Sequence, residues 1–331
     1  MNKKNLIFIF IFSAFFIVFF IGCKKIDFKD LKEENLVKNI EKNNFSNENA
    51  YENNSNQDNH TLKNKFVDEL IQNNISKKIN SSLYNNNPYK NLRNNDWLKP
   101  SKNLSWHWQL NGNLNMNYTV LIYDIDLFDN SKETIEKLHN KGIKVICYFS
   151  AGTYEDFRPD KEDFPKEILG KTLDEWQNEK WLDIRKIDIL RPIMIKRFDL
   201  AVEKGCDALE LDNVDGYQNE NGFSLTYEDQ LKYNIWLSEE AHKRNLFVGL
   251  KNDLDQINDL VDYYDFAINE KCFEYDECEK LIPFIEKNKA VLGVEYNLEM
   301  NEFCEKANKL NFSWLKMDYE LDGKRKSCIS N

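Results

Sequence analysis

Histidine, closely spaced cysteine pairs and excess positive charge are all scarce in this chain. Its 331 residues include four scattered histidines and seven cysteines, none of them in a CxxC pair. Zinc sites are usually built from such clustered ligands, so we expect no metal and no other cofactor. Lys and Arg number 45 against 56 Asp and Glu, which gives a net charge of −11. That surplus repels polyanions such as nucleic acid and attracts a cationic partner, unless it merely aids solubility.

The N-terminus holds the one long hydrophobic run. Lys3 and Lys4 precede an almost unbroken apolar stretch over residues 6–21, which Gly22 and Cys23 follow. This order is typical of a secretory signal and resembles a bacterial lipoprotein signal, in which lipid is attached to the cysteine. A plain anchor helix is the alternative, but the run is short for a span of ~20 residues. We expect a signal peptide over residues 1–22, lipidation at Cys23, and a membrane-anchored lipoprotein, periplasmic or at the cell surface.

Residues 23–96 are poor in apolar side chains. Asn, Lys, Glu, Asp and Ser dominate this segment, and residues 85–87 are three consecutive asparagines. Such a composition buries too little surface to offset the entropy lost on ordering, so we expect a disordered tether. A flexible coil of ~70 residues would reach on the order of 45 Å, enough to hold a following domain clear of a membrane.

Six cysteines remain beyond Cys23, and export would place them where disulfides persist. The candidate pairs are Cys272 with Cys278 and Cys304 with Cys328, which lie near each other in the sequence. Cys147 and Cys206 fall in or next to strand-like runs, and we expect them to be buried thiols. The sequence does not exclude that all six are unbridged.

Strand-like and helical segments alternate over residues 97–331, which predicts an α/β domain. The expected strands are 106–110, 120–124, 144–149, 208–211, 247–250, 267–269, 290–295 and 312–316. The expected helices are 132–140, 187–204, 227–243, 254–263, 276–288 and 299–310. Eight strands over ~235 residues fit a single TIM-type (β/α)8 barrel. The first two strands lack a helix between them, so an open doubly wound sheet is the alternative.

Polar residues gather where these strands end. Barrel enzymes collect catalytic and binding groups at the carboxyl ends of their strands, so we expect a substrate site there. The residues at these ends are Asp124, Asp126, Tyr148, Asp212, Lys251, Asn252, Glu270, Glu295 and Tyr296. We place Asp124, Asp126, Asp215 and Glu295 around the mouth of the barrel, where they would attract a cation.

Alternation along one strand places Glu210 and Asp212 on the same face. Glu210 then points into the barrel one layer below Asp212, and burial of its carboxylate is costly unless a cation pairs with it. Lys251 on the next strand is the expected cation, in contact with Glu210 or Asp212. An internal ion pair without a catalytic duty is the alternative.

The pair Asp212 and Glu270 has the chemistry that glycoside hydrolysis needs, one carboxyl to donate a proton and another to attack the sugar carbon or activate water. Asp212 beside Lys251 suits the ionised role. Glu270 follows an apolar run and has only Lys271 as an adjacent cation, so it suits the proton donor.

Tryptophans provide candidate surfaces for a sugar ring. Trp106 and Trp108 share one face of the first strand, and Trp176 and Trp181 lie in a long insertion over residues 152–184 that we expect to form an ordered lid or cleft wall. Trp108 and Trp181 are the candidates for substrate contact, and core packing is the alternative.

Seven segments in this part of the chain resemble the signature blocks of glycoside hydrolase family 114. They are Trp106–Leu110, Tyr123–Asp129, Val145–Gly152, Trp181–Arg185, Asp212–Tyr217, Gly249–Asp253 and Asn269–Phe273. The resemblance implies a (β/α)8 endo-α-1,4-polygalactosaminidase that cuts galactosamine-containing polysaccharide. It also implies that Asp212 and Glu270 are the catalytic acids, and it adds Asn213, Asp215 and Tyr217 to the candidate binding residues. Leu211 stands where Pro is common, and Lys271 stands where Gln is common.

We therefore expect a glycosidase that cuts internal α-1,4 linkages of a cationic amino-sugar polysaccharide, with a retaining outcome favoured over an inverting one. The alternative is a non-catalytic surface lipoprotein that binds the same polymer. The sequence does not indicate the acetylation state of the substrate or the oligomeric state.

Overall fold

The computed structural model describes residues 96–99 and 104–329 of the chain. The predicted signal peptide, the lipidation site Cys23 and nearly all of the predicted tether lie outside these residues. Within them, no helix is long and apolar enough to cross a membrane.

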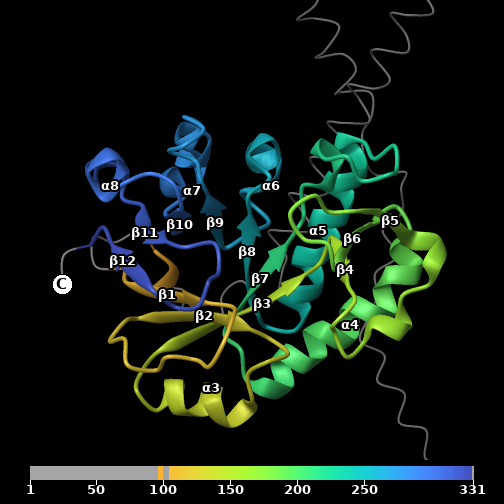
Figure 1. Ribbon diagram of the computed structural model, residues 1–331, viewed down its shortest axis with the longest axis horizontal. Helices are drawn as coiled ribbons and strands as arrows, with labels where there is room; N and C mark the ends of the chain where they lie inside the picture. The colour runs from red at the N-terminus through yellow and green to blue at the C-terminus, as the bar shows by residue number, and fades with distance from the viewer. Residues whose placement is uncertain (1–95, 100–103, 330–331) are drawn as a thin grey trace, which may run out of the picture. The chain divides into compact units, whose positions relative to one another are not determined.

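Eight parallel strands form the predicted TIM-type barrel (Figure 1). Apolar runs bounded by turn residues build them, as expected for strands buried on both faces. They are β1 (Trp106–Gln109), β2 (Ile122–Asp126), β3 (Lys144–Ser150), β7 (Ala208–Asp212), β8 (Phe247–Lys251), β9 (Phe266–Glu270), β10 (Val291–Glu295) and β11 (Ser313–Met317). Each pairs in parallel with the next in this order. The last strand of this sheet, β12 (Arg325–Ser327), pairs antiparallel with β11.

The segment between β11 and β12 returns to β1. The backbone N–H groups of Leu110 and Asn111 both donate to the carbonyl oxygen of Leu321, at 3.1 and 3.2 Å. The Trp106 indole N–H donates to the carbonyl oxygen of Ser313 at 2.9 Å. These contacts tie the first strand to the last, so the barrel interpretation is confirmed over the open sheet.

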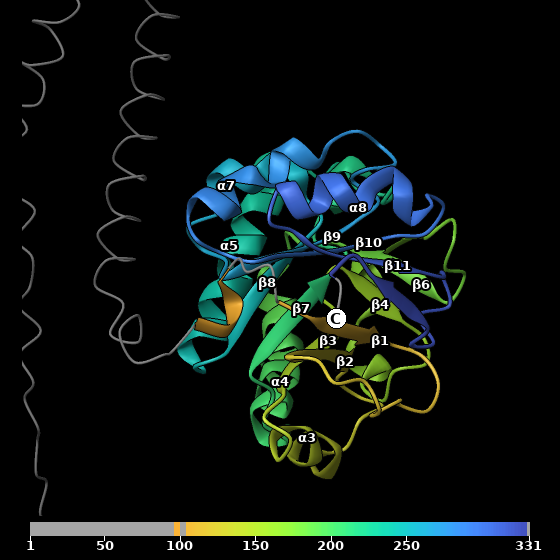
Figure 2. The same ribbon diagram turned by 90° about the vertical axis from the view of Figure 1, so that its left-hand side faces the viewer.

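Helices flank the strands on both sides (Figures 1 and 2). They are α3 (Lys132–His139), α4 (Ile187–Lys204), α5 (Tyr227–Lys243), α6 (Ile257–Leu260), α7 (Ile282–Glu286) and α8 (Met300–Lys309). Side-chain caps fix their starts: Ser131 accepts from the backbone of Thr134, and Thr226 and Asp229 form a capping box. Gly205 ends α4 in the left-handed conformation, with φ of 89°.

Two predicted helices are shorter than expected. Residues 254–263 form the 3-10 turn η5 (Leu254–Gln256) followed by α6, and residues 276–288 form η6 (Cys278–Leu281) followed by α7. No helix is present between β1 and β2 in the described chain; residues 110–121 form bends, a turn and irregular backbone there.

The insertion after β3 is ordered, as predicted. It contains a small antiparallel sheet of β4 (Thr153–Glu155), β6 (Glu179–Leu182) and β5 (Leu169–Thr172), in that spatial order. The short 3-10 turns η2 (Lys161–Asp163) and η3 (Lys166–Ile168) connect β4 to β5. Arg158 anchors the insertion to the barrel, because its Nη2 lies 2.7 Å from Asp126 and 2.7 Å from Glu155.

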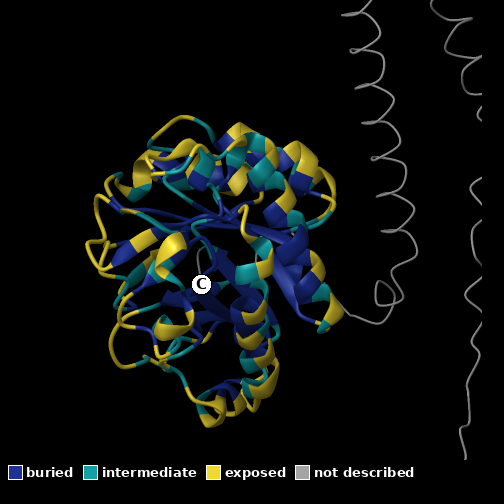
Figure 3. Cartoon of the chain, turned by 90° about the vertical axis from the view of Figure 1, so that its right-hand side faces the viewer, coloured by how far each residue is buried: buried dark blue, intermediate teal, exposed yellow. Residues whose placement is uncertain are grey.

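The core has two layers, one between strands and helices and one inside the barrel. Figure 3 shows buried strands between helices whose outer faces are exposed. The inner layer includes Trp106 and Trp108, whose rings stack 6.0 Å apart and are 1% and 0% exposed. The burial of Trp108 favours the alternative of core packing, and its contact with substrate stays a prediction.

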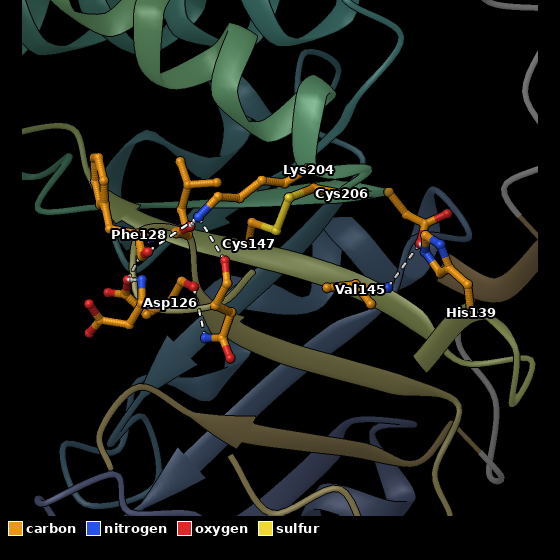
Figure 4. The surroundings of a disulfide bond; sticks show 11 residues. Asp126, Phe128, His139, Val145, Cys147, Lys204 and Cys206 are labelled. Carbon is orange, nitrogen blue, oxygen red and sulfur yellow. Dashed lines mark hydrogen bonds and ion pairs between the residues drawn. A yellow bond between two sulfur atoms is a disulfide. The ribbon is translucent and has the colours of Figure 1, made fainter. Parts of the chain in front are cut away.

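Three disulfides cross-link the described chain. Cys272–Cys278 and Cys304–Cys328 confirm the two predicted pairs. The expectation that Cys147 and Cys206 are buried thiols is wrong, because they form a third disulfide with Cα atoms 6.0 Å apart (Figure 4). Cys147 points to the helix side of β3, opposite to Tyr148, and Cys206 follows the cap of α4 on that same side.

Candidate active site

Lys251 is the centre of a charge cluster at the carboxyl ends of three adjacent strands. It ends β8, between β7 and β9, and its Nζ is 2.7 Å from Glu210 Oε1, 3.2 Å from Asp212 Oδ1 and 3.4 Å from Glu270 Oε2. The predicted contacts with Glu210 and Asp212 are confirmed. Asp212 Oδ1 and Glu270 Oε2 both contact the same Lys251 nitrogen, so these two oxygens lie less than about 7 Å apart. That is close enough for the two carboxyl groups to act on one glycosidic bond.

Asp212 receives three donors. The Tyr148 hydroxyl donates to Oδ2 at 3.0 Å, and the backbone N–H of Asn213 donates to Oδ1 at 2.9 Å, beside Lys251. Asn213 adopts φ of 59° and its side chain donates to the hydroxyls of Ser150 and Thr153. Asn213 thus acts on Asp212 through the backbone and fixes the turn after β7.

Glu270 receives a matching set of donors. The Tyr296 hydroxyl donates to Oε1 at 2.6 Å and the Asn252 amide donates to Oε2 at 3.3 Å, beside Lys251. Burial opposes ionisation, but Lys251 and these hydrogen bonds outweigh it and hold the pKa of Glu270 below its usual range. The expectation that Glu270 has no cation beyond Lys271 is wrong, since the reach of Lys251 across the strand ends is not visible in the sequence.

Three acids expected at the mouth of the barrel are buried instead. Asp124 is fully buried below the catalytic pair, where burial and the neighbouring Glu210 carboxylate raise its pKa well above its usual range. Glu295 is fully buried, and its Oε1 accepts from the backbone N–H of Phe273 at 2.9 Å, which fixes the loop after β9. Asp126 is also buried, in the ion pair with Arg158. Asp124 thus lies beneath the site, whereas Glu295 packs on the helix-facing side of β10 and Asp126 holds the insertion. None of the three is exposed at the rim.

A cleft of about 400 Å³ opens in front of Glu270. Asp215 and Asp253 contribute acidic groups to it, and burial raises their pKa values to about 6 and about 8. Three exposed aromatic side chains, those of Trp176, Tyr275 and Tyr319, also line it. Asn252 and Tyr296 complete the predicted residues that reach this cleft.

Some lining residues escaped the sequence reasoning, and some predicted residues lie elsewhere. Asp253 ends the Gly249–Asp253 segment, just after β8, and Tyr319 lies two residues after β11. Their positions next to strand ends could have marked both as candidate site residues. Trp181 is 8% exposed and packs over Gly216, where an added Cβ would lie 3.1 Å from its ring. The Tyr217 ring packs edge-on against Tyr227 at 5.7 Å. Neither residue lines the cleft, whereas Trp176 does.

A parallel barrel that brings two carboxyls to one ammonium beside an aromatic-lined cleft has the architecture of a glycoside hydrolase. The chain belongs to glycoside hydrolase family GH114, whose sequence profile matches residues 87–331. The crystal structure of Aspergillus fumigatus Ega3 in complex with galactosamine is 40% identical, with a TM-score of 0.66, over 70% of this chain and 97% of that one.

Two further relatives are more distant. The glycoside hydrolase domain of PelA from Pseudomonas aeruginosa is 12% identical with a TM-score of 0.54, over 67% of this chain and 97% of that one, and shares the fold. The uncharacterized protein MJ1477 of Methanocaldococcus jannaschii is 27% identical, over 70% of this chain and 73% of its own length.

Proposed function

We propose that this glycosidase cuts internal α-1,4 linkages of a galactosamine-containing polysaccharide. The observation that carries the proposal is the joint contact of Asp212 and Glu270 with Lys251, at 3.2 and 3.4 Å. The galactosamine bound to Ega3 supports an amino sugar as substrate. Aromatic side chains on several rim loops, Trp176, Tyr275 and Tyr319, would hold sugars on both sides of a cut and so favour internal cleavage.

In the proposed mechanism Asp212 attacks the anomeric carbon and Glu270 protonates the departing oxygen. Asp212 Oδ1 and Glu270 Oε2 lie less than about 7 Å apart, which includes the spacing of about 5 Å typical of retaining enzymes, so we favour retention of configuration. Lys251 and the Tyr148 hydroxyl hold the Asp212 carboxyl in position for attack. Since the pKa of Glu270 is lowered in the free enzyme, its protonated fraction is small at neutral pH and grows on acidification. We therefore expect kcat/KM to increase as the pH falls from 7 toward the ordinary range of carboxyl groups.

The experiment is incubation of the protein with partly de-N-acetylated α-1,4-galactosamine polymer, with release of oligosaccharides followed by mass spectrometry. We expect Asp212→Asn to abolish release, and NMR of the first products to show the α anomer. Glu270→Gln should keep activity on an aryl glycoside with a good leaving group and lose it on the polymer. Activity of Glu270→Gln on the polymer contradicts the role of donor. Retention of polymer by the unaltered protein without cleavage supports the non-catalytic surface lipoprotein instead.

We also propose that the protein is exported and held at a membrane by lipid on Cys23. The pairing of six cysteines into three disulfides supports an oxidising compartment. Fractionation of cells that express the unaltered chain or Cys23→Ala tests this, since the substitution should move the protein from the membrane fraction to the soluble exported fraction. An unchanged distribution contradicts a lipid anchor at this residue.

A further inference from the structure

Lys271 places a positive charge inside a cleft whose other lysine, Lys280, is paired with Asp255 and Glu277. It follows Glu270 directly, with φ of 67°, and lines the same cleft. Its Nζ lies over the rings of Tyr275 and Tyr319, 5.4 and 5.9 Å from their centroids. Among the residues that the structure describes, it forms no ion pair with a carboxylate. The Lys271 ammonium therefore keeps its full charge beside the two tyrosines.

The tyrosine subsite, defined by Lys271, Tyr275 and Tyr319, is built to accept a ligand. The two tyrosines are 59% and 43% exposed, so a ligand in the cleft can reach their rings. The disulfide Cys272–Cys278 closes the short loop that carries Tyr275, and Tyr319 stacks on Tyr296 at 4.3 Å. Both rings are thus held in place before any ligand binds, which limits the entropy lost on binding.

The opposite part of the cleft has the reverse charge. Asp215 and Asp253, which we call the acidic subsite, come from the loops after β7 and β8. Asp253 is 2% exposed, and its Oδ1 has no hydrogen-bond partner in the described chain, so it offers an unused acceptor. By contrast, the nearby Asp255 is already paired with Lys280 at 2.7 Å. Burial raises the pKa values of Asp215 and Asp253 to about 6 and about 8, and an ammonium group bound beside them would favour their ionised forms.

We infer that Lys271 is a specificity-determining residue that excludes a free amino sugar from the tyrosine subsite and selects an N-acetylated one there. An acetamido group is neutral, its carbonyl oxygen can accept from the Lys271 ammonium, and its methyl group can pack on the tyrosine rings. The acidic subsite takes a sugar with a free ammonium. This inference rests on the proposed function and names its substrate as a polymer that carries both kinds of sugar.

Repulsion between two ammonium groups across a solvent-accessible cleft supplies the selectivity. We expect a fully de-N-acetylated oligomer to be cut roughly tenfold more slowly, in kcat/KM, than one with an acetamido sugar at the tyrosine subsite. Products from a mixed polymer should then carry an acetylated sugar at a fixed distance from the new ends.

The experiment compares α-1,4-linked hexamers that are fully de-N-acetylated with hexamers that carry one acetamido sugar at each position in turn. Lys271→Gln should cut the fully de-N-acetylated hexamer several-fold faster and lose the fixed position of the acetylated sugar. Lys271→Arg keeps the charge and should keep the preference. Lys287→Gln is the matched control, because it removes one positive charge from the surface pair with Asp262, outside the cleft.

The outcomes separate the two proposals. If neither polymer nor any hexamer is cut, the proposed function is wrong and the inference is wrong with it. If the unaltered protein cuts the fully de-N-acetylated hexamer as fast as the others, or if Lys271→Gln behaves like Lys287→Gln while retaining the unaltered far-ultraviolet spectrum and Tm, the inference is overturned and the proposed function stands.

Discussion

Lys251 Nζ lies 2.7 Å from Glu210 Oε1, and the two side chains are 2% and 0% exposed, so the cation of the active site is held from beneath by a fully buried carboxylate. Glu210 precedes Asp212 by two residues in β7, so it lies one layer deeper in the barrel than the ion pairs of Lys251 with Asp212 and Glu270. This layered arrangement makes the position of the catalytic pair depend on a residue that no substrate touches.

Removal of the buried cation should therefore affect stability as well as catalysis. Lys251→Met leaves Glu210 buried without a cation, and we expect a loss of about 3 to 5 kcal/mol in the free energy of unfolding, together with loss of polymer cleavage. The double variant Lys251→Met with Glu210→Gln should recover much of the stability and none of the activity. Urea unfolding and oligosaccharide release measure the two effects. A single variant that stays stable and active would contradict this account.

The buried Asp253 predicts a stability that declines with rising pH. Burial raises its folded pKa to about 8, above the unfolded value of about 3.9, so between these values the folded state alone holds the proton. The free energy of unfolding should then fall with pH across this window by up to about 1.4 kcal/mol per pH unit from this group, and level off above it. Below the unfolded value both states are protonated, and the group has no effect.

Asp253→Asn removes this titration. Compared with the unaltered protein, the variant should gain stability progressively from pH 5 to pH 8, as measured by urea unfolding at fixed ionic strength. Parallel pH dependences in the two proteins would show that Asp253 ionises as readily in the folded state as in the unfolded one.

Gly152 allows the backbone after β3 to approach the turn after β7. A Cβ atom at this residue would lie 1.6 Å from the carbonyl oxygen of Asn213, and the backbone N–H of Gly152 donates to the carbonyl oxygen of Asp212 at 3.1 Å. Gly152→Ala should therefore displace Asp212 and lower kcat by about 100-fold.

Gly142→Ala is the control for this prediction. Gly142 follows α3 with φ of +76° and has open space around it, so the substitution should lower Tm through backbone strain without a change in kcat. Equal kcat values in the two alanine variants would contradict the role assigned to Gly152.

The three disulfides should differ in their contributions to stability. Cys147–Cys206 spans 59 residues and Cys272–Cys278 spans 6. From loop-closure entropy, paired substitution to Ala should cost about 4 kcal/mol for the first and about 2 kcal/mol for the second. Loss of the second should also raise KM, because the loop of Tyr275 is freed. Equal unfolding free energies with an unchanged KM would contradict both expectations.

The barrel was predictable because buried parallel strands and capped helices leave strong local patterns, and α4 and α5 begin and end at the predicted residues. The contact of Lys251 with Glu210 was predictable because alternation along a strand fixes which residues share a face. The contact of Lys251 with Glu270 was not, because it depends on how far a long side chain reaches across a neighbouring strand end.

Other parts of the site depend on three-dimensional detail that local patterns do not contain. Trp108 has a typical sugar-binding side chain, but its strand face is turned into a packed barrel interior. Tyr275 and Tyr319 join one subsite although 44 residues separate them along the chain, because loops after β9 and β11 meet at the rim. The pairing of Cys147 with Cys206 arises from adjacency between a strand and the cap of a helix.

The complete pairing of six cysteines has a practical consequence for the seventh. Cys23 is the one cysteine of the sequence that these three bonds do not use. If lipid is attached to its sulfur, a thiol-reactive dye added to the unreduced, denatured protein finds nothing to label, whereas an unprocessed chain binds one equivalent of dye. A simple colour measurement thus distinguishes the anchored form of the enzyme from its precursor.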